Sequence, residues 1–199
     1  MNKKQLKEIN DFFNNRYKVH GNSVASLDWS KETQMLRFEI FSGFQDLNNK
    51  TILDVGSGFG DLGHYLKKKY PKVKYTGYDI NENFISHCEN KKDFTFELRN
   101  ILENPPTKKF DAVYSIGTLN SKFTGNREVT KQYIKRLFDS CNILTAISMT
   151  SSYVDKGHKN PLAFYYDPSE MFKYAKTLTK KVTLRHDYLP HDFTLILYK

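Results

Sequence analysis

The sequence predicts an α/β fold with one mostly parallel sheet whose last strand is reversed. Beyond residue 37, short apolar runs of strand length alternate with helical patterns, which is typical of a parallel sheet covered by helices on both faces. The chain of 199 residues suits a single hydrophobic core, so we expect one folded unit. Its last two apolar runs are joined by residues 189–192, too few for a crossover connection, so these strands should pair antiparallel.

The first part of the chain predicts two helices that together form a lid. Apolar residues recur at helical spacing in two segments, first Leu6, Ile9, Phe13 and Tyr17, and then Met35, Phe38, Phe41 and Phe44. Ser30 precedes the second run and is a good helix N-cap. We therefore expect an N-terminal helical lid over residues 1–37 and a folded domain over residues 38–199.

The rest of the chain predicts strands and helices in alternation. Seven strands are expected, at residues 51–55, 74–79, 94–99, 111–116, 143–149, 182–188 and 193–198. Helices are expected near residues 61–70, 81–90, 127–141 and 168–177. Asp167 should cap the last of these, because Pro168 follows at the first helical position and Glu170 lies three residues after the cap. In this pattern both cysteines, Cys88 and Cys141, fall in helices.

Composition favours a soluble, cytoplasmic protein and limits its partners. The formal net charge of +9 rests on 25 lysines and 6 arginines, yet arginine is the residue whose planar fork suits phosphates and base edges. We therefore interpret the basic excess as a solvated surface and do not expect nucleic acid as a partner. The apolar runs are shorter than a membrane span requires, so no membrane partner is expected. The two cysteines lack C-x-x-C spacing and should be reduced thiols.

One glycine-rich stretch, ILDVGSGFGDLG, contains two overlapping patterns that would bind different ligands. The pattern that begins at Gly58 fits the G-x-G-x-x-G turn of dinucleotide sites, whereas Gly56, Gly58 and Gly60 fit the G-x-G-x-G turn of an S-adenosylmethionine site. Asp54 favours the second pattern, because a carboxylate beside the turn would repel a pyrophosphate but attract a ligand that carries an ammonium and a sulfonium. Gly63 is then a helix-packing position, and a nicotinamide-dependent oxidoreductase is disfavoured.

Three motifs resemble those of the class I S-adenosylmethionine-dependent methyltransferases. Residues 52–60 resemble motif I of that family, residues 75–80 (YTGYDI) its second motif, and residues 109–115 (KFDAVYS) its strand-four motif. The likeness extends in order and spacing over residues 40–199 and is to the small bacterial single-domain kind. It implies a Rossmann-like sheet, S-adenosylmethionine as the methyl donor and S-adenosylhomocysteine as the product.

The resemblance also implies which residues hold the cofactor. Asp79 would accept both ribose hydroxyls, and the turn after the first strand would hold the methionine end. Asn100 replaces the acidic residue that usually meets the adenine amino group, and it would accept through its amide oxygen. Arg37 would pair with the cofactor carboxylate or with an acidic substrate. The complete expected set is Asp54, Gly56, Ser57, Gly58, Gly60, Asp79, Ile80, Asn100, Ile101, Ser115, Gly117 and Arg37.

Residues for the acceptor should come from the lid and from loops at the carboxyl edge of the sheet, where aromatic rings and a few polar groups suit a small-molecule pocket. The expected acceptor-binding set is His20, Trp29, Asn120, Tyr153, Tyr165 and Tyr166. Methyl transfer needs a general base only when the acceptor arrives protonated. The candidates for a catalytic group are Asn120, Tyr153, His158 and His191. No further ligand cluster accompanies His186 and His191, so no metal site is expected.

The sequence therefore predicts a methyltransferase that acts on oxygen or nitrogen of a small-molecule acceptor, with an anionic molecule as one option. One alternative within the same chemistry is a protein, peptide or RNA methyltransferase that uses the lysine-rich surface. The other is a catalytically silent protein that binds S-adenosylmethionine. The identity of the acceptor and the oligomeric state stay open.

Overall fold

The computed structural model describes residues 1–88 and 93–199. Within these residues, seven strands form one sheet in the order β3-β2-β1-β4-β5-β7-β6. The strands are β1 (Thr51–Val55), β2 (Lys74–Asp79), β3 (Thr95–Leu98), β4 (Phe110–Ile116), β5 (Cys141–Thr150), β6 (Val182–Leu189) and β7 (Asp192–Tyr198). Strand β7 is antiparallel to both of its neighbours and the other pairings are parallel, which confirms the predicted sheet with its reversed last strand.

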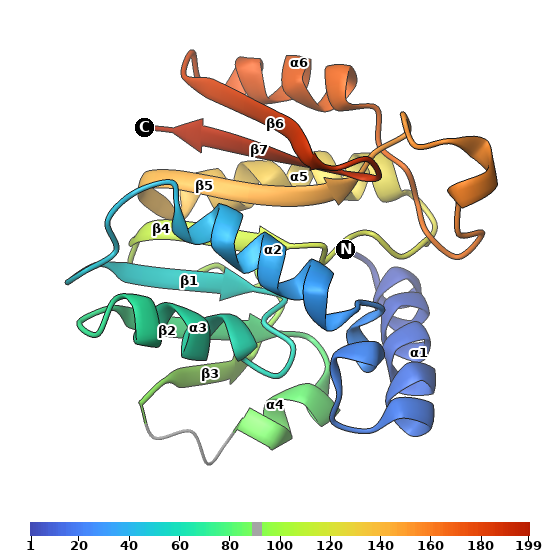
Figure 1. The fold of residues 1–199 in the computed structure, drawn as a ribbon, viewed down its shortest axis with the longest axis horizontal. Coiled ribbons are helices and arrows are strands. Elements are labelled where there is room, and N and C mark those ends of the chain that lie inside the picture. The colour runs from blue at the N-terminus through green and yellow to red at the C-terminus, as the bar shows by residue number, and fades with distance from the viewer. Residues whose placement is uncertain (89–92) are drawn as a thin grey trace.

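Helices cover both faces of this sheet. They are α1 (Lys3–His20), α2 (Lys31–Ser42), α3 (Asp61–Lys69), α4 (Glu82–Cys88), α5 (Asn126–Asp139) and α6 (Pro168–Leu178), with 3₁₀ helices η1 (Val24–Leu27) and η2 (Lys156–His158). Helices α2 and α3 lie on one face and α5 on the other (Figure 1). Successive strand residues serve the two faces in turn, so Ile52 packs in the core with α2 and α3, while Leu53 packs with α5 and α6.

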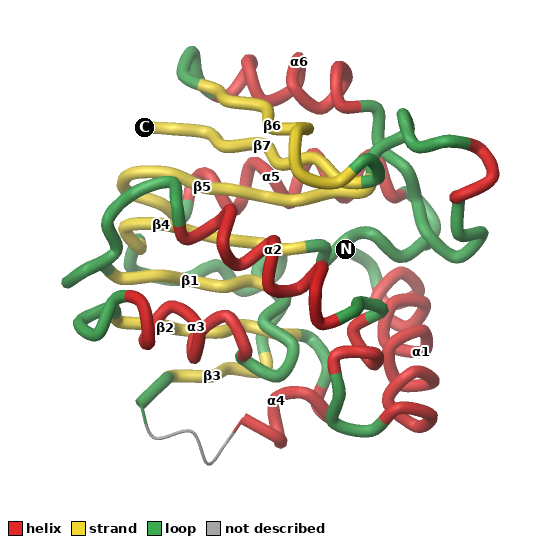
Figure 2. The backbone as a smooth tube through the Cα atoms, in the orientation of Figure 1, coloured by secondary structure: helices red, strands yellow, loops and turns green. Residues whose placement is uncertain are grey.

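Helix α1 and the loops that position the site lie at the carboxyl edge of the sheet. In Figure 1, α1 stands beyond the arrowheads of the parallel strands, joined to α2 through η1. Figure 2 shows that the long connection between β5 and α6 lies at the same edge. Ser30 caps α2 as predicted, by accepting from the Thr33 N–H. Residue 37, the expected end of the lid, lies within α2, so this helix crosses that boundary.

Most predicted elements are present with ends shifted by a few residues, and one helix end was wrong. The helix expected over residues 127–141 ends at Asp139, because the Cys141 segment pairs with the start of β4 and begins β5 instead. Asp167 caps α6 as predicted. The end of the helix expected at residues 81–90 lies outside the described residues. None of the helices in the described part of the chain has the length and apolar character that crossing a membrane requires.

Candidate active site

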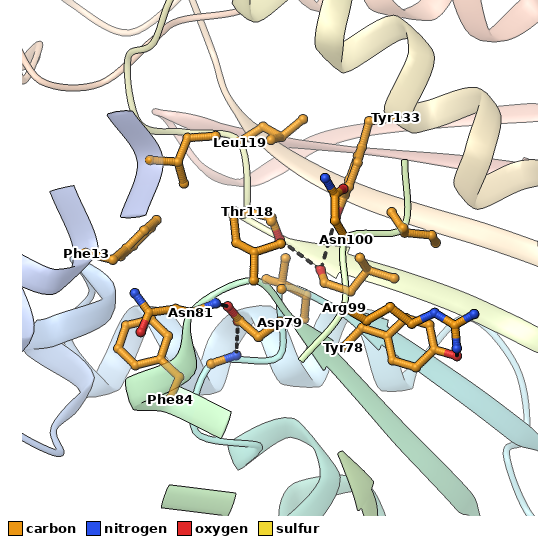
Figure 3. A pocket seen from close by; sticks show the side chains of 18 of the residues that line it. Phe13, Tyr78, Asp79, Asn81, Phe84, Arg99, Asn100, Thr118, Leu119 and Tyr133 are labelled. Atoms are coloured by element: carbon orange, nitrogen blue, oxygen red, sulfur yellow. Dashed lines mark hydrogen bonds between the residues drawn. The ribbon is translucent and has the colours of Figure 1, made fainter. Parts of the chain in front are cut away.

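The first cavity lies beyond the carboxyl ends of β1, β2 and β4 and encloses about 80 Å³. Its floor comes from the turns that follow these strands, and residues of α1, the η1 segment and α4 close it from the lid side (Figure 3). Of the expected cofactor set, it gathers Gly56, Gly58, Asp79, Ile80, Asn100, Ile101 and Gly117. The strands and their turns therefore bring more than half of that set to one place.

The turn after β1 requires glycine because its backbone is left-handed at three positions. Gly56, Gly58 and Gly60 have φ values of 81°, 54° and 76°, a region that other residues enter at a cost. A Cβ on Gly58 would come within 3.0 Å of the Leu27 side chain, so bare backbone faces the cavity there. Gly60 does not line the cavity. It precedes α3 as its N-cap and packs under Phe96.

Asp79 joins the two turns that form the floor of the first cavity. Its carboxylate accepts from the Gly58 N–H at 2.8 Å and from the Asn81 N–H at 2.9 Å, and the side chain is 8% exposed. Burial raises the pKa of Asp79, although these backbone N–H groups pull it back down. Each oxygen accepts one of these bonds and keeps a further lone pair, so the carboxylate can still accept from ligand hydroxyls.

Asn100 presents its amide nitrogen, not its oxygen, as the unused group. The oxygen accepts from the Leu102 N–H at 3.1 Å, so the amide cannot be turned over without losing that bond. Within the described part of the chain, Nδ2 is buried without a hydrogen-bond partner. The amide oxygen keeps a further lone pair for an adenine amino group, as the sequence led us to expect, and the unused Nδ2 adds a donor that suits a ring nitrogen.

Asp54 lies on the other side of the glycine turn from the first cavity. It faces a third cavity of about 20 Å³, which it shares with Gly56, Ser57 and Trp29. The Tyr75 hydroxyl donates to its Oδ2 at 2.7 Å. Burial raises the pKa of Asp54 to about 7, against the lowering effect of the Tyr75 hydrogen bond. The Ser57 hydroxyl, beside Asp54, is buried and has no partner among the residues described.

A hydrogen-bonded support beneath the first cavity contains Thr118 and Tyr133, which the sequence patterns missed, and Ser115, which was expected to bind the cofactor. Thr118 donates to the Val55 carbonyl at 2.9 Å, and Tyr133 donates to the same oxygen at 3.2 Å (Figure 3). Ser115 in turn donates to Thr118 at 2.8 Å. Ser115 is fully buried and does not line the first cavity. Tyr133 comes from α5, far along the chain, and no local motif marks it.

A second cavity of about 290 Å³ adjoins the first. Four residues line both cavities and form the wall between them, namely Phe13, Leu27, Trp29 and Gly117. A Cβ on Gly117 would come within 2.8 Å of the Trp29 ring, so in this part of the wall the ring packs on bare backbone. Of the residues predicted for the acceptor and for catalysis, this cavity gathers Trp29, Asn120, Tyr165 and His191.

Arg37 lines the second cavity rather than the first. Its Nε donates to Asp192 Oδ2 at 2.7 Å, and the two side chains are 4% and 0% exposed. Its guanidinium carbon lies 4.9 Å from the Trp29 ring centroid, within cation–π range. Burial lowers the pKa of the neighbouring His191, an effect that Asp192 opposes and Arg37 strengthens. The lowered pKa favours the neutral form of the His191 imidazole.

Three predicted acceptor residues lie away from both cavities. His20 ends α1 on the exposed surface, and Tyr153 is 60% exposed, with its hydroxyl against Ser169. Tyr166 is 1% exposed because its hydroxyl bonds to the Leu119 carbonyl and to Thr130 in the core. The side chain of His158, a catalytic candidate, lies outside the described part of the structure. No group of three or more metal-ligating side chains occurs among the described residues.

The glycine turn, the acidic end of β2 and a parallel sheet with a reversed last strand define a class I methyltransferase fold. Comparison with known proteins agrees, because residues 46–182 match a family model described as a methyltransferase domain. The chain belongs to this family and is an S-adenosylmethionine-dependent methyltransferase. A protein of Mycobacterium tuberculosis named as a methyltransferase is 24% identical over 154 residues, which are 75% of this chain and 93% of the relative.

Two solved structures share the fold over almost the whole chain. The plantazolicin methyltransferase BpumL superposes with a TM-score of 0.71 at 16% identity, covering 98% of this chain and 95% of its own. The magnesium protoporphyrin IX methyltransferase of Synechocystis, with bound S-adenosylhomocysteine, has a TM-score of 0.69 at 15% identity and covers 97% and 99%. At this identity the likeness establishes the fold.

Proposed function

We propose that this enzyme transfers a methyl group from S-adenosylmethionine in the first cavity to oxygen or nitrogen of a small molecule in the second. The observation that carries the proposal is the wall of Phe13, Leu27, Trp29 and Gly117, which both cavities share, so that ligands in the two cavities would contact the same residues. The names of the similar structures, which refer to a porphyrin and to plantazolicin, support a small or natural-product acceptor.

The residues around the first cavity fit this cofactor. Asp79 offers carboxylate oxygens for ribose hydroxyls, and the unpartnered Nδ2 of Asn100 offers a donor for an adenine ring nitrogen. Bare backbone at Gly58 allows a ligand to approach closely. The Asp54 carboxyl group lies beyond the turn, and the ammonium and sulfonium of the methionine end would favour its ionised form, which would in turn attract them.

When bound, the cofactor supplies an electrophilic methyl group on a sulfonium sulfur. The chain has to hold the acceptor in line with it and exclude water, and such alignment is worth roughly 7–11 kcal/mol of a barrier. Trp29 and Phe13 supply rigid apolar surface at the boundary, and Asn120 is fixed by accepting from the Thr150 N–H at 3.1 Å. These residues can orient an acceptor without reacting themselves.

His191 is the group in the second cavity that can take a proton. Burial favours the neutral form of its imidazole, as described above, so a ring nitrogen can accept the proton of a hydroxyl or amine acceptor as its oxygen or nitrogen attacks. We propose His191 as the general base for such acceptors.

Calorimetry with S-adenosylhomocysteine tests the cofactor half of the proposal. Asp79→Asn should weaken binding by about 1–3 kcal/mol, because one acceptor oxygen and the charge are lost. The matched control is Asp111→Asn, since Asp111 also accepts a backbone N–H, that of Thr51 at 2.8 Å, but lies at the opposite end of the strands. Equal affinities for wild type and Asp79→Asn would contradict the assignment.

A further inference from the structure

The second cavity contains a buried cation that protein groups satisfy only in part. Arg37 is 4% exposed and lines this cavity. Of the five N–H groups of a guanidinium, the Nε group donates to Asp192 and one Nη1 group donates to the Thr33 carbonyl at 3.3 Å. Nη2 forms no hydrogen bond with any residue that the structure describes. A buried charge with unused donors indicates a place for an anion.

Asp192 balances the charge of this cation and fixes its orientation, but it occupies only one of the guanidinium N–H groups. It is fully buried at the start of β7 and contacts Arg37 through Oδ2 alone, while its Oδ1 has no partner among the described residues. Trp29 packs on the guanidinium from the lid side. The Thr33 carbonyl, Asp192 and the Trp29 ring thus hold the head group in place, with its remaining N–H groups available to the cavity.

The other residues that line the second cavity indicate what kind of molecule would carry the anionic group. Phe12, Phe13, Leu162 and Tyr165 contribute aromatic and aliphatic surface. The acidic side chain on this wall, Asp28, is paired with Arg16 at 3.0 Å and so does not compete strongly for Arg37. A cavity of about 290 Å³ has room for a ring or a short chain, and polar lining residues such as Asn120 and Asn160 can bind a hydroxyl or amine on it.

We propose that the methyl acceptor is an apolar or aromatic molecule that carries a carboxylate, and that this carboxylate binds the free N–H groups of Arg37. The inference rests on the proposed function, because it names the substrate class of the second cavity. A carboxylate matches the planar fork of a guanidinium, and charge-assisted hydrogen bonds of this kind are the strong ones. A neutral amide of the same shape could accept from the free N–H groups only through an uncharged oxygen, so its hydrogen bonds to Arg37 would be weaker.

The test compares acids with their neutral amides on the full-length protein saturated with S-adenosylhomocysteine. The probes are benzoate with benzamide and octanoate with octanamide, titrated by calorimetry or ligand-observed NMR. At least one acid should bind about 10- to 100-fold more tightly than its amide. If neither acid binds, or if acid and amide bind equally, the proposal is wrong.

Variants then test whether Arg37 causes the preference for acid over amide. Removing Arg37 alone would leave Asp192 buried without its partner, so the variant carries Arg37→Gln and Asp192→Asn together. Its preference for acid over amide should vanish while its affinity for S-adenosylhomocysteine stays within about twofold of wild type. The control pair is Arg185→Gln with Asp187→Asn, an exposed ion pair on β6, which should keep the preference.

The outcomes separate this inference from the proposed function. A preference for acid that persists without Arg37 overturns the inference alone, and wild-type protein that fails to bind S-adenosylhomocysteine overturns the proposed function. Should the double variant not fold, Arg37→Lys gives a second measurement. It keeps the charge but loses the planar fork, so the acid preference should fall by about tenfold; an unchanged preference would contradict the proposed contact.

Discussion

At the residue scale, the proposed role of His191 as a general base depends on its pKa, which its surroundings in the second cavity set. Because burial and Arg37 lower its pKa, the histidine should stay neutral to a lower pH than free imidazole. We predict that, for a hydroxyl or amine acceptor, kcat/KM falls on the acid side, at a lower pH than the pKa of free imidazole would give. His191→Gln should lower kcat by about 10²–10⁴-fold and abolish this acid limb. A variant with the wild-type pH profile would exclude His191 as the base.

At this scale, sequence patterns cannot tell which of two adjacent, chemically similar residues faces a ligand. Tyr165 and Tyr166 are chemically alike, and the sequence predicted both for the acceptor pocket. Tyr166 forms a parallel bridge with Ser151 and turns into the core, whereas its neighbour lines the second cavity. Neighbouring residues of extended chain point to opposite sides, and only the packing of the β5–α6 connection decides which one faces the ligand.

At the element scale, the glycine turn and the lid form one unit. Gly58→Ala should place a methyl group against Leu27 and strain the turn, because φ there is 54°. We predict a loss of about 1–3 kcal/mol in unfolding free energy together with at least about tenfold weaker binding of S-adenosylhomocysteine. The first is measured by urea unfolding and the second by calorimetry.

Gly21→Ala is the matched control for that variant. Gly21 also has a positive φ, of 59°, but nothing lies within 4 Å of an added Cβ, and it ends α1 away from the cavities. It should therefore lose stability through strain and keep wild-type affinity. Equal losses of affinity in both variants would mean that strain, and not contact with the cavity, is responsible.

The elements themselves were largely predictable from local patterns. β1, β2 and the capped start of α6 appear where periodicity and capping residues predicted them. The end of α5 was not predictable in this way, because helical spacing continues through the segment before Cys141. The helix ends there because Phe110 pairs with Cys141 in the sheet. Local propensity sets where an element forms, but tertiary contacts set where it ends.

At the scale of the whole molecule, a buried carboxyl group makes stability depend on pH. Asp54 has its pKa raised from 3.8 to about 7. The unfolded chain releases this proton as pH rises through about 4, whereas the folded protein retains it, so the unfolding free energy should fall between about pH 4 and pH 7 and then level off.

Asp54→Asn tests this dependence. Asparagine can still accept from Tyr75 but carries no charge, so the variant should be about 1–3 kcal/mol more stable than wild type at about pH 8, with a smaller difference at about pH 4. Its affinity for S-adenosylhomocysteine should nevertheless be lower, since the cofactor ammonium loses a counter-charge. Urea unfolding at both pH values and calorimetry measure the two effects. A stability difference that does not change with pH would contradict the raised pKa.

From the sequence alone came the fold class, the reversed last strand and the methyltransferase family. These depend on local signals, namely alternating periodicity, a connection too short for a crossover, and a glycine turn flanked by carboxylates. The tertiary structure decided which side chains share a cavity. Arg37 meets Asp192 across 155 residues, and Trp29 separates the two cavities. Such contacts depend on how α2 and β7 approach each other in space, and no spacing along the chain encodes that approach.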